Sequence, residues 1–249
     1  MMLKSPREIE IMGRGGKILR ATLLQMRDAV RPGVSTMEID TIGEAFIRSH
    51  AGAEPAFKGY HGYPATICAS VNEQVVHGIP SARKLVAGGI LSVDLGAKMD
   101  GVYGDSAVTV PVGAISPDAA RLLEVTKQSL HEALAVVKAG ARLSDIGAAV
   151  QRHVEAAGFS VVREFVGHGI GQTLHEEPQI PNYGTPGRGP RLAEGMVLAI
   201  EPMVNMGGAG VKVLSDGWTA VTKDGSLSAH FEHTVAVTAD GPRILTRSE

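Results

Sequence analysis

Asp94 and Asp105 have the residue type and spacing of a site that could do chemistry. They lie in the segment SVDLGAKMDGVYGDSAVT, whose other residues are mostly apolar, small or turn-forming. The central DG dipeptide predicts a hairpin turn, and the resulting register places Asp105 opposite Gly96. Asp94 and Asp105 then become diagonal neighbours on one face of the hairpin, about 7 to 8 Å apart at the backbone, and their carboxylates can converge.

A second pair of acids, Glu201 and Glu232, repeats this pattern. LVAGGILSVD, which ends at Asp94, resembles LAEGMVLAIE, which ends at Glu201, when 107 is added to each residue number. DSAVTV from Asp105 resembles EHTVAV from Glu232 when 127 is added, so about twenty extra residues, including Trp218, separate the second pair. Self-similarity at a fixed offset indicates a structural repeat. We therefore predict two halves, about 5–115 and 116–246, related by a pseudo-two-fold axis.

The repeat brings all four acids to one buried centre, and this predicts a metal site. A buried, uncompensated carboxylate costs several kcal/mol, so four of them together need a cationic partner. Carboxylate oxygens suit hard or borderline divalent ions, and two ions bridged by shared carboxylates are a recurrent hydrolytic arrangement. The alternative is that each acid is a solvated turn residue, and the shared offsets argue against it.

Histidines near the acids could complete such a site. The segment EFVGHGIGQTLHEEP places His168 between glycines and His175 seven residues later, and NEQVVHGIP contains His77. Glycines allow the backbone to approach a bound group closely. The spacing does not match the G-x-G-x-x-G pattern of dinucleotide-binding loops, so we exclude that alternative.

Three further histidines lie near these motifs. His233 follows Glu232 on a predicted strand, so its side chain points to the opposite face. The pattern leaves the roles of His61 and His230 open.

Four predicted helices surround the strands that carry the acids. Capping residues precede helical hydrophobic spacing at Ser5, Ser35, Ser116 and Ser144. The order of helix, helix and strands then occurs twice, which predicts an α/β (α+β) fold with a duplicated architecture.

Composition excludes several other classes of protein. The chain has 249 residues, 44% of them hydrophobic, enough for one large domain or two small ones. A net charge of −2 and a pI near 6.5 predict neither a nucleic-acid nor an anionic-membrane partner. A single cysteine, Cys68, excludes an intrachain disulfide, and no signal peptide or 18-residue apolar span is evident. We expect a cytoplasmic protein.

Taken together, the motifs resemble those of type I methionine aminopeptidases of the bacterial, minimal-length kind, in metallopeptidase family M24. The resemblance covers about residues 5–246 and rests on five blocks: GYHGYPATICASVNEQVVHGIP, SVDLGAKMDGVYGDSA, EFVGHGIGQTLHEEP, MVLAIEPMV and DGWTAVTKDGSLSAHFEHTVAVT. It implies the duplicated pita-bread fold as a single catalytic domain, 1–249. The implied activity is removal of the initiator methionine from nascent proteins whose second residue is small.

The resemblance also implies the metal site and its chemistry. It implies two divalent ions, without choosing among Co²⁺, Mn²⁺, Fe²⁺ and Zn²⁺, and five ligands: Asp94, Asp105, His168, Glu201 and Glu232. Glu201 would carry the proton during attack on the peptide bond. His175 would donate to the developing oxyanion, and His77 would hold the backbone of the scissile peptide.

The same resemblance implies an apolar, partly aromatic pocket for the methionine side chain, in which a thioether gains dispersion and sulfur–aromatic contacts. The matching positions are Phe57, Tyr60, Tyr63, Cys68 and Trp218. Ordinary core packing is an alternative role for Phe57 and Cys68. The sequence departs from the family's usual residues at Phe57, Tyr103 and Leu174, which affects the expected pocket shape but changes no ligand.

The expected partners are N-termini of nascent polypeptides, and the expected state is a monomer. The loop GTPGRGPR is a candidate for contact with the ribosome near its exit tunnel. Two other functions are alternatives: a proline-directed aminopeptidase of the same fold, which usually carries an extra N-terminal domain, and a catalytically silent binding protein, which would have lost ligands. A nucleophilic role for Cys68 lacks a positioned base in the pattern.

Overall fold

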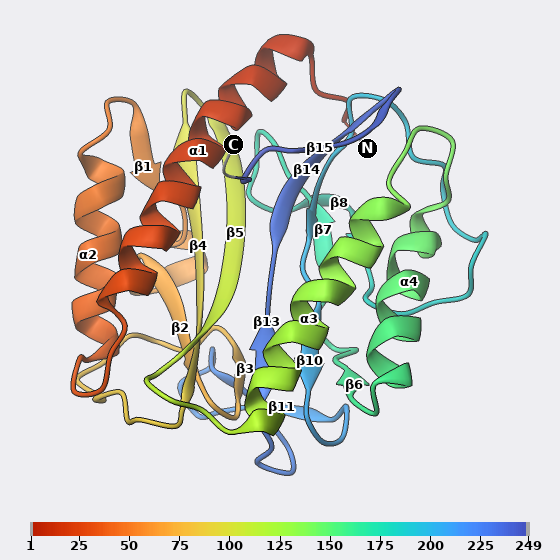
Figure 1. Cartoon of the computed structure of the whole chain (residues 1–249). Coiled ribbons are helices and arrows are strands. Elements are labelled where there is room, and N and C mark those ends of the chain that lie inside the picture. Colours follow the sequence, from red (N-terminus) through yellow and green to blue (C-terminus); the bar gives the residue numbers. More distant parts are fainter. Residues whose placement is uncertain (1, 248–249) are drawn as a thin grey trace.

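Two pairs of helices flank the strands of this α/β protein (Figure 1). The structure, a computed structural model, describes residues 2–247; residues 1, 248 and 249 of the predicted domain lie outside the described residues. The first pair is α1 (Pro6–Ala29) and α2 (Thr36–Arg48), and the second is α3 (Pro117–Ala135) and α4 (Leu143–Ala156). Within residues 2–247, no helix has the length and hydropathy that crossing a membrane requires.

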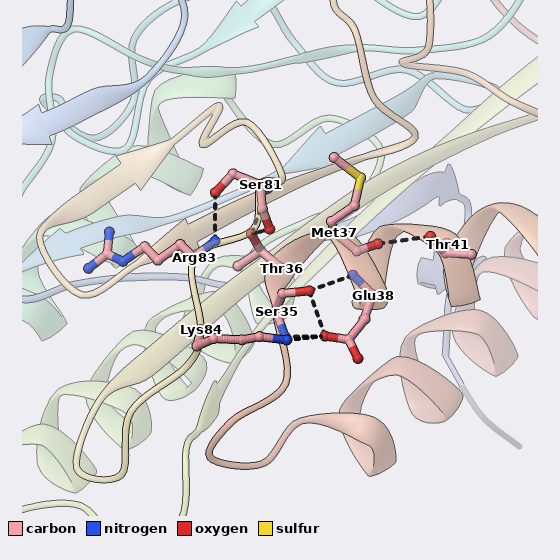
Figure 2. Close-up of polar contacts among 8 residues, drawn as sticks. All are labelled: Ser35, Thr36, Met37, Glu38, Thr41, Ser81, Arg83 and Lys84. Carbon is pink, nitrogen blue, oxygen red and sulfur yellow. Dashed lines mark hydrogen bonds and ion pairs between the residues drawn. The ribbon is translucent and has the colours of Figure 1, made fainter.

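The predicted capping residues begin three of these helices. At α2, the Ser35 hydroxyl accepts from the Glu38 backbone N–H at 3.2 Å, and the Glu38 carboxylate accepts from the Ser35 N–H at 2.7 Å (Figure 2). Lys84 also contacts this carboxylate, at 2.9 Å. Ser5 forms the same capping box at α1, and Ser116 accepts from a backbone N–H at α3. The caps satisfy N–H groups that have no partner inside the helix.

The prediction of Ser144 as the fourth cap is wrong. Helix α4 begins at Leu143, and Arg142 is the N-cap residue, whose backbone N–H donates to Asp145 at 2.9 Å. Ser144 instead exchanges two hydrogen bonds of 2.8 Å with the backbone of Arg188. The Ser144 hydroxyl is therefore bonded to the backbone of the loop at Arg188 and does not cap the helix.

The offset of 107 recurs in backbone pairing. Ser35 forms an isolated antiparallel β-bridge with Lys84, and Arg142 forms one with Arg191. The residue numbers in the second bridge exceed those in the first by the same amount, since 142 − 35 and 191 − 84 are both 107. The start of the second helix is thus held in the same way in each half.

Two larger sheets supply the acids, one from each half. The four-stranded sheet has the order β1-β4-β2, with β5 pairing with β4, and its strands are β1 (Ala53–Pro55), β2 (Ile67–Val71), β4 (Ile90–Met99) and β5 (Val102–Pro111). The five-stranded sheet has the order β15-β14-β9-β7-β8, and its strands are β7 (Gly167–Gly169), β8 (Glu176–Ile180), β9 (Val197–Ile200), β14 (His233–Thr238) and β15 (Gly241–Ile244).

Two three-stranded sheets and a short helix complete the described elements. One sheet has the order β13-β10-β6 and the other β11-β12-β3, and η1 is a 3₁₀ helix (Tyr60–Gly62). The bounds are β3 (Gln74–Val76), β6 (Ser160–Val161), β10 (Met203–Asn205), β11 (Val211–Val213), β12 (Ala220–Thr222) and β13 (Ser228–His230). The sheet β11-β12-β3 joins the insertion of the second half to a strand of the first.

The two halves meet where β5 lies beside β14. The Glu232 backbone N–H donates to Ala107 O at 3.0 Å. The Thr234 hydroxyl accepts from the Asp105 N–H at 2.9 Å and donates to the Asp105 carbonyl at 2.7 Å. These bonds place one acid of each half at the junction.

Apolar side chains fill the space between the helices and the sheets. Leu19, Leu23 and Ile39 of α1 and α2 are buried against the first sheet, and Leu122 and Ile146 of α3 and α4 are buried in the second half. Each half therefore has its own core, and the acids lie between the two.

Candidate metal centre

The hairpin that carries Asp94 and Asp105 has the predicted register. Asp105 pairs with Gly96 across β4 and β5. Asp100 and Gly101 form the turn, and both have positive φ, 47° and 89°, as a type I′ turn requires. Asp94 and Asp105 are thus diagonal neighbours on the same face of the sheet.

The acids of the second half lie at the end of a ladder. Glu201 directly follows β9 and Glu232 directly precedes β14, and the terminal pair between these strands is Ile200 with His233. Glu201 and Glu232 therefore extend from facing strand ends, whereas the first pair lies diagonally within a hairpin.

The register of strand pairing in the second half differs from the register that the sequence offset of 127 implies. The pair that matches Ile200 with His233 is Val93 with Val108, since 200 − 93 is 107. The structural offset on the second strand is then 233 − 108, or 125, which is two less than the value of 127 that sequence similarity suggests. An alignment of Asp105 with Glu232 does not show this shift of two residues in the strand pairing.

His168 joins the acids from β7. Its Nε2 atom lies 3.5 Å from Oε1 of Glu201 and 4.0 Å from Oδ2 of Asp105. Asp105, His168 and Glu232 each offer a ligand atom within 4.8 Å of the others. The Nδ1 atom of His168 lies 2.8 Å from Gly169 O, so it donates there and leaves Nε2 as the acceptor that faces the acids.

The electrostatics of this cluster fit a divalent cation. Burial, and then neighbouring carboxylates, raise the pKa values of Asp94 and Glu232 well above their ordinary values. Burial raises the pKa of Asp105 to about 7. Oδ1 of Asp94 and Oε1 of Glu232 are buried without a hydrogen-bond partner. A cation would stabilise the ionised carboxylates and use these acceptors.

Burial also favours the neutral form of His168, which is the form that binds metal ions. It lowers the pKa of His168 to about 4, so the imidazole is neutral at pH 7. A neutral imidazole is a common ligand of borderline divalent metals. Oxygen and nitrogen donors are therefore present together in one buried cluster.

The residues of the cluster line a cavity of about 370 Å³. All twelve residues that the sequence predicted for the site line it: Phe57, Tyr60, Tyr63, Cys68, His77, Asp94, Asp105, His168, His175, Glu201, Trp218 and Glu232. His61 and Leu174 also line the cavity. Tyr103 is not among its lining residues, and its backbone N–H donates to Gly171 O at 2.8 Å.

Aromatic side chains also line the cavity. The rings of Tyr63 and Trp218 meet edge to face, with centroids 5.0 Å apart. Phe57 packs over Gly96, where a Cβ atom would lie 2.8 Å from its ring. Cys68 is buried and lies opposite Asp94 in the ladder between β2 and β4. The acids and the aromatic wall thus face a common space.

His175 lies between the acids and the aromatic residues. Its Nδ1 atom is 2.9 Å from the Tyr60 hydroxyl, and its ring centroid is 4.3 Å from that of His168. Burial, and then the proximity of His61, lower the pKa of His175. The pKa of His77 is lowered to about 4, first by burial. Both imidazoles are therefore neutral at pH 7.

His230 is a site residue whose role the sequence pattern left open. Its Nε2 atom lies 3.7 Å from Oε2 of Glu201, and neither ring nitrogen has a hydrogen-bond partner. Burial lowers its pKa to about 3. It precedes Glu232 by two residues, and side chains two apart on extended backbone share a face, so this spacing could have identified it.

Comparison with known proteins identifies the family. The profile of Metallopeptidase family M24 matches residues 10–239. The chain belongs to metallopeptidase family M24. Family M24 consists of metallopeptidases, and the buried cluster of Asp105, His168 and Glu232 is compatible with a divalent-metal site.

Curated relatives of this M24 metallopeptidase match along its whole length. It is 56% identical over 247 residues to methionine aminopeptidase 1 of Bacillus subtilis (strain 168), covering 99% of each chain. It is 52% identical over 246 residues to methionine aminopeptidase of Clostridium perfringens, covering 99% of this chain and 98% of the relative.

Solved structures show the same fold. The crystal structure of methionine aminopeptidase from Thermotoga maritima matches with a TM-score of 0.97 and 47% identity, covering 100% of both chains. The prolidase of Pyrococcus horikoshii OT3 matches with a TM-score of 0.79 and 21% identity, covering 99% of this chain and 64% of that one. The predicted duplicated pita-bread fold is therefore confirmed for this M24 metallopeptidase.

Proposed function

We propose that this chain is a methionine aminopeptidase that removes the initiator methionine from nascent polypeptides whose second residue is small. The buried cluster of Asp105, His168 and Glu232, which opens into an aromatic-walled cavity of about 370 Å³, is the observation that carries the proposal. Relatives at 56% and 52% identity bear the name methionine aminopeptidase.

The proposed metal site holds two divalent ions. Its ligands would be five residues that line the cavity: Asp94, Asp105, His168, Glu201 and Glu232. Such ions supply Lewis acidity towards the peptide carbonyl and lower the pKa of water. The unpartnered oxygens of Asp94 and Glu232 support this assignment.

The protein's own groups would move and place protons. Glu201 lies 3.5 Å from Nε2 of His168, and burial raises the pKa of Glu201 well above the ordinary value, which suits a carboxyl that accepts and returns a proton. The Tyr60 hydroxyl, 2.9 Å from Nδ1 of His175, donates to that nitrogen and leaves Nε2–H free to donate to a substrate oxygen. His77, whose ring centroid lies 6.4 Å from that of Trp218, would bind the backbone of the scissile peptide.

The aromatic wall would bind the methionine side chain. Tyr63, Trp218 and Phe57 offer ring faces and edges to a flexible thioether. The buried Cys68 fills the base of this wall. The pocket would then select methionine over related apolar side chains by shape. Such a pocket discriminates by about 1–3 kcal/mol of binding free energy for each methylene group.

The two halves contribute jointly to the proposed site, so we propose that residues 1–249 act as one catalytic domain. Because its substrates would emerge from ribosomes, we also propose that the enzyme works in the cytoplasm, close to the site of synthesis. The prolidase likeness, at 21% identity, shows the fold alone and does not favour a proline-directed activity.

Hydrolysis of model peptides tests the proposal. Protein stripped with a chelator should release methionine from Met-Ala-Ser, but hardly from Met-Leu-Ser, only after Mn²⁺ or Co²⁺ is added back. Release of the first residue from Ala-Pro-Gly instead would favour the proline-directed activity. No release from any peptide, with metal shown to be bound, would favour a silent binding protein.

A further inference from the structure

Residues of α1, α3, β5 and β14 line a groove. Figure 1 shows how these four elements are arranged around the junction of β5 and β14. Two adjoining cavities of about 640 and 550 Å³ form the groove. They share five lining residues: Arg20, Leu23, Val108, Lys127 and Phe231. Asp94, Asp105, His168 and Glu201 line neither of these cavities, so the groove shares only Glu232 with the residues proposed for the metal centre.

Strand alternation separates the two sites. Asp105 lines the metal cavity, while its neighbour Ser106 lines the groove. His233 likewise faces the groove, as the sequence predicted, and Nδ1 of His233 lies 2.8 Å from the Thr246 hydroxyl. Glu232 borders both sites, but its carboxylate offers its ligand atom to the cluster with Asp105.

Three arginine or lysine side chains and one carboxylate, that of Glu232, line the larger cavity. Arg20 comes from α1, Lys127 from α3 and Arg247 from the segment after β15. Among residues 2–247, no carboxylate forms an ion pair with any of these three side chains. Glu232 and, in the smaller cavity, Glu124 offset part of this positive charge, and an anion that enters the groove would offset the rest.

Arg20 is the most informative of these residues. Its Nε atom is buried and has no hydrogen-bond partner. Burial, and then the positive charge of Arg27, lower the pKa of the Arg20 guanidinium. A guanidinium that is partly desolvated and unpaired is costly, and its planar fork matches phosphate oxygens.

The floor of the groove is apolar. Leu23 and Phe231 are buried, with 3% and 8% of their surface exposed, and Val108 is half-buried beside them. Leu130 and Leu134 of α3 continue this surface. A bare inorganic anion would leave the floor unused, whereas a ligand with an apolar or aromatic body would cover it.

We propose that this groove binds an organic polyphosphate, a soluble di- or triphosphate ester with an apolar or aromatic body. Arg20 of α1 and Lys127 of α3, which line both cavities, hold phosphate oxygens, and the floor at Phe231 receives the body. This binding site is additional to the metal centre and does not depend on the proposed peptidase activity.

Calorimetric titration of the metal-loaded protein with MgATP, used as the probe, tests this site. We expect saturable binding of one ligand per chain with a Kd below about 1 mM. Lys127→Gln and Arg20→Gln should each weaken binding by about tenfold or more, because each removes one charge-assisted contact. Lys127 is exposed, so its replacement should leave the fold intact.

Matched controls decide between this groove and other sources of binding. Arg152→Gln on α4 and Lys138→Gln beyond α3 remove exposed positive charges outside the groove and should leave the Kd unchanged. Absence of saturable binding, or a Kd that Lys127→Gln and Arg20→Gln do not alter, would overturn the proposal. Pyrophosphate that binds as tightly as MgATP would overturn the role given to the apolar floor.

Discussion

Nε2 of His168 lies 3.5 Å from Oε1 of Glu201, although the two residues belong to different strand regions. His168 is on β7, and Glu201 follows the end of β9, which pairs with β7. A neutral imidazole nitrogen and a carboxylate oxygen thus face each other beside Asp105 and Glu232. This combination of nitrogen and oxygen donors is the composition of a metal site, and Glu201 lies at contact distance from its histidine.

Glu201→Gln should lower kcat for Met-Ala-Ser by about 10²–10⁴-fold, because an amide cannot carry a proton between reacting groups. Initial rates with Mn²⁺, together with the metal content of the variant, would measure this. Glu194→Gln, an exposed acid seven residues earlier, is the control and should retain full activity. A fully active Glu201→Gln protein with normal metal content would exclude the proposed proton transfer.

Tyr60→Phe should reduce kcat/KM by about two- to tenfold, the range expected for the loss of one neutral hydrogen bond. The variant keeps the ring in the cavity but removes the hydroxyl that lies 2.9 Å from Nδ1 of His175. Steady-state kinetics of Tyr60→Phe and His175→Ala, singly and combined, would measure the coupling. Fully additive losses would show that the hydroxyl does not act through His175.

The metal-free protein should lose stability as pH rises from about 4 to about 7. The folded-state pKa of Asp105, raised to about 7 from an ordinary 3.8, means that the native state binds more protons than the unfolded state in this window. Its unfolding free energy therefore falls with increasing pH, by an amount on the order of a few kcal/mol.

Urea denaturation of the metal-free protein and of Asp105→Asn at several pH values would test this. The variant should be the more stable of the two near pH 8, and the difference should disappear near pH 4. Added Mn²⁺ should stabilise the wild-type protein by about 2.7 kcal/mol at a concentration of 100 Kd. A wild-type advantage without metal at pH 8 would contradict this account of the cluster.

Cys68 should resist alkylation in the folded protein. Burial, and then the nearby Asp94, raise the pKa of its thiol well above the ordinary value, so the reactive thiolate is scarce at pH 8. Treatment with iodoacetamide, followed by intact-mass spectrometry, should show one added group only when urea is present. Rapid labelling of the native protein would mean that the pocket wall opens, and would also revive a nucleophilic role for Cys68.

Ser35→Ala should destabilise the protein by about 1 kcal/mol, because the N3 backbone N–H of α2 loses its acceptor. Chemical denaturation would measure the change in unfolding free energy. Ser35→Thr keeps a capping oxygen and serves as the control. Equal losses for both variants would indicate that packing around Ser35, rather than its hydroxyl, is responsible.

Local signals in the sequence predicted much of this molecule. The DG turn and the alternating strands determine the register of the hairpin with Asp94 and Asp105, because an Asp-Gly turn favours one pairing. Ser5, Ser35 and Ser116 cap helices through contacts within four residues, and such contacts need no tertiary information. The internal repeat identified the second pair of acids, which lie at facing strand ends rather than within a hairpin.

Only the tertiary structure decided the remaining features. Three of them depend on contacts between distant segments. These are the shift of two residues in the pairing of β14, the position of the N-cap of α4 at Arg142 instead of Ser144, and the burial of His230 beside Glu201. The basic groove likewise exists because α1 and α3, which are distant in the sequence, lie on either side of one strand junction. Sequence patterns report what a segment prefers, whereas packing determines which distant groups share a space and so which are desolvated, paired or left without a partner.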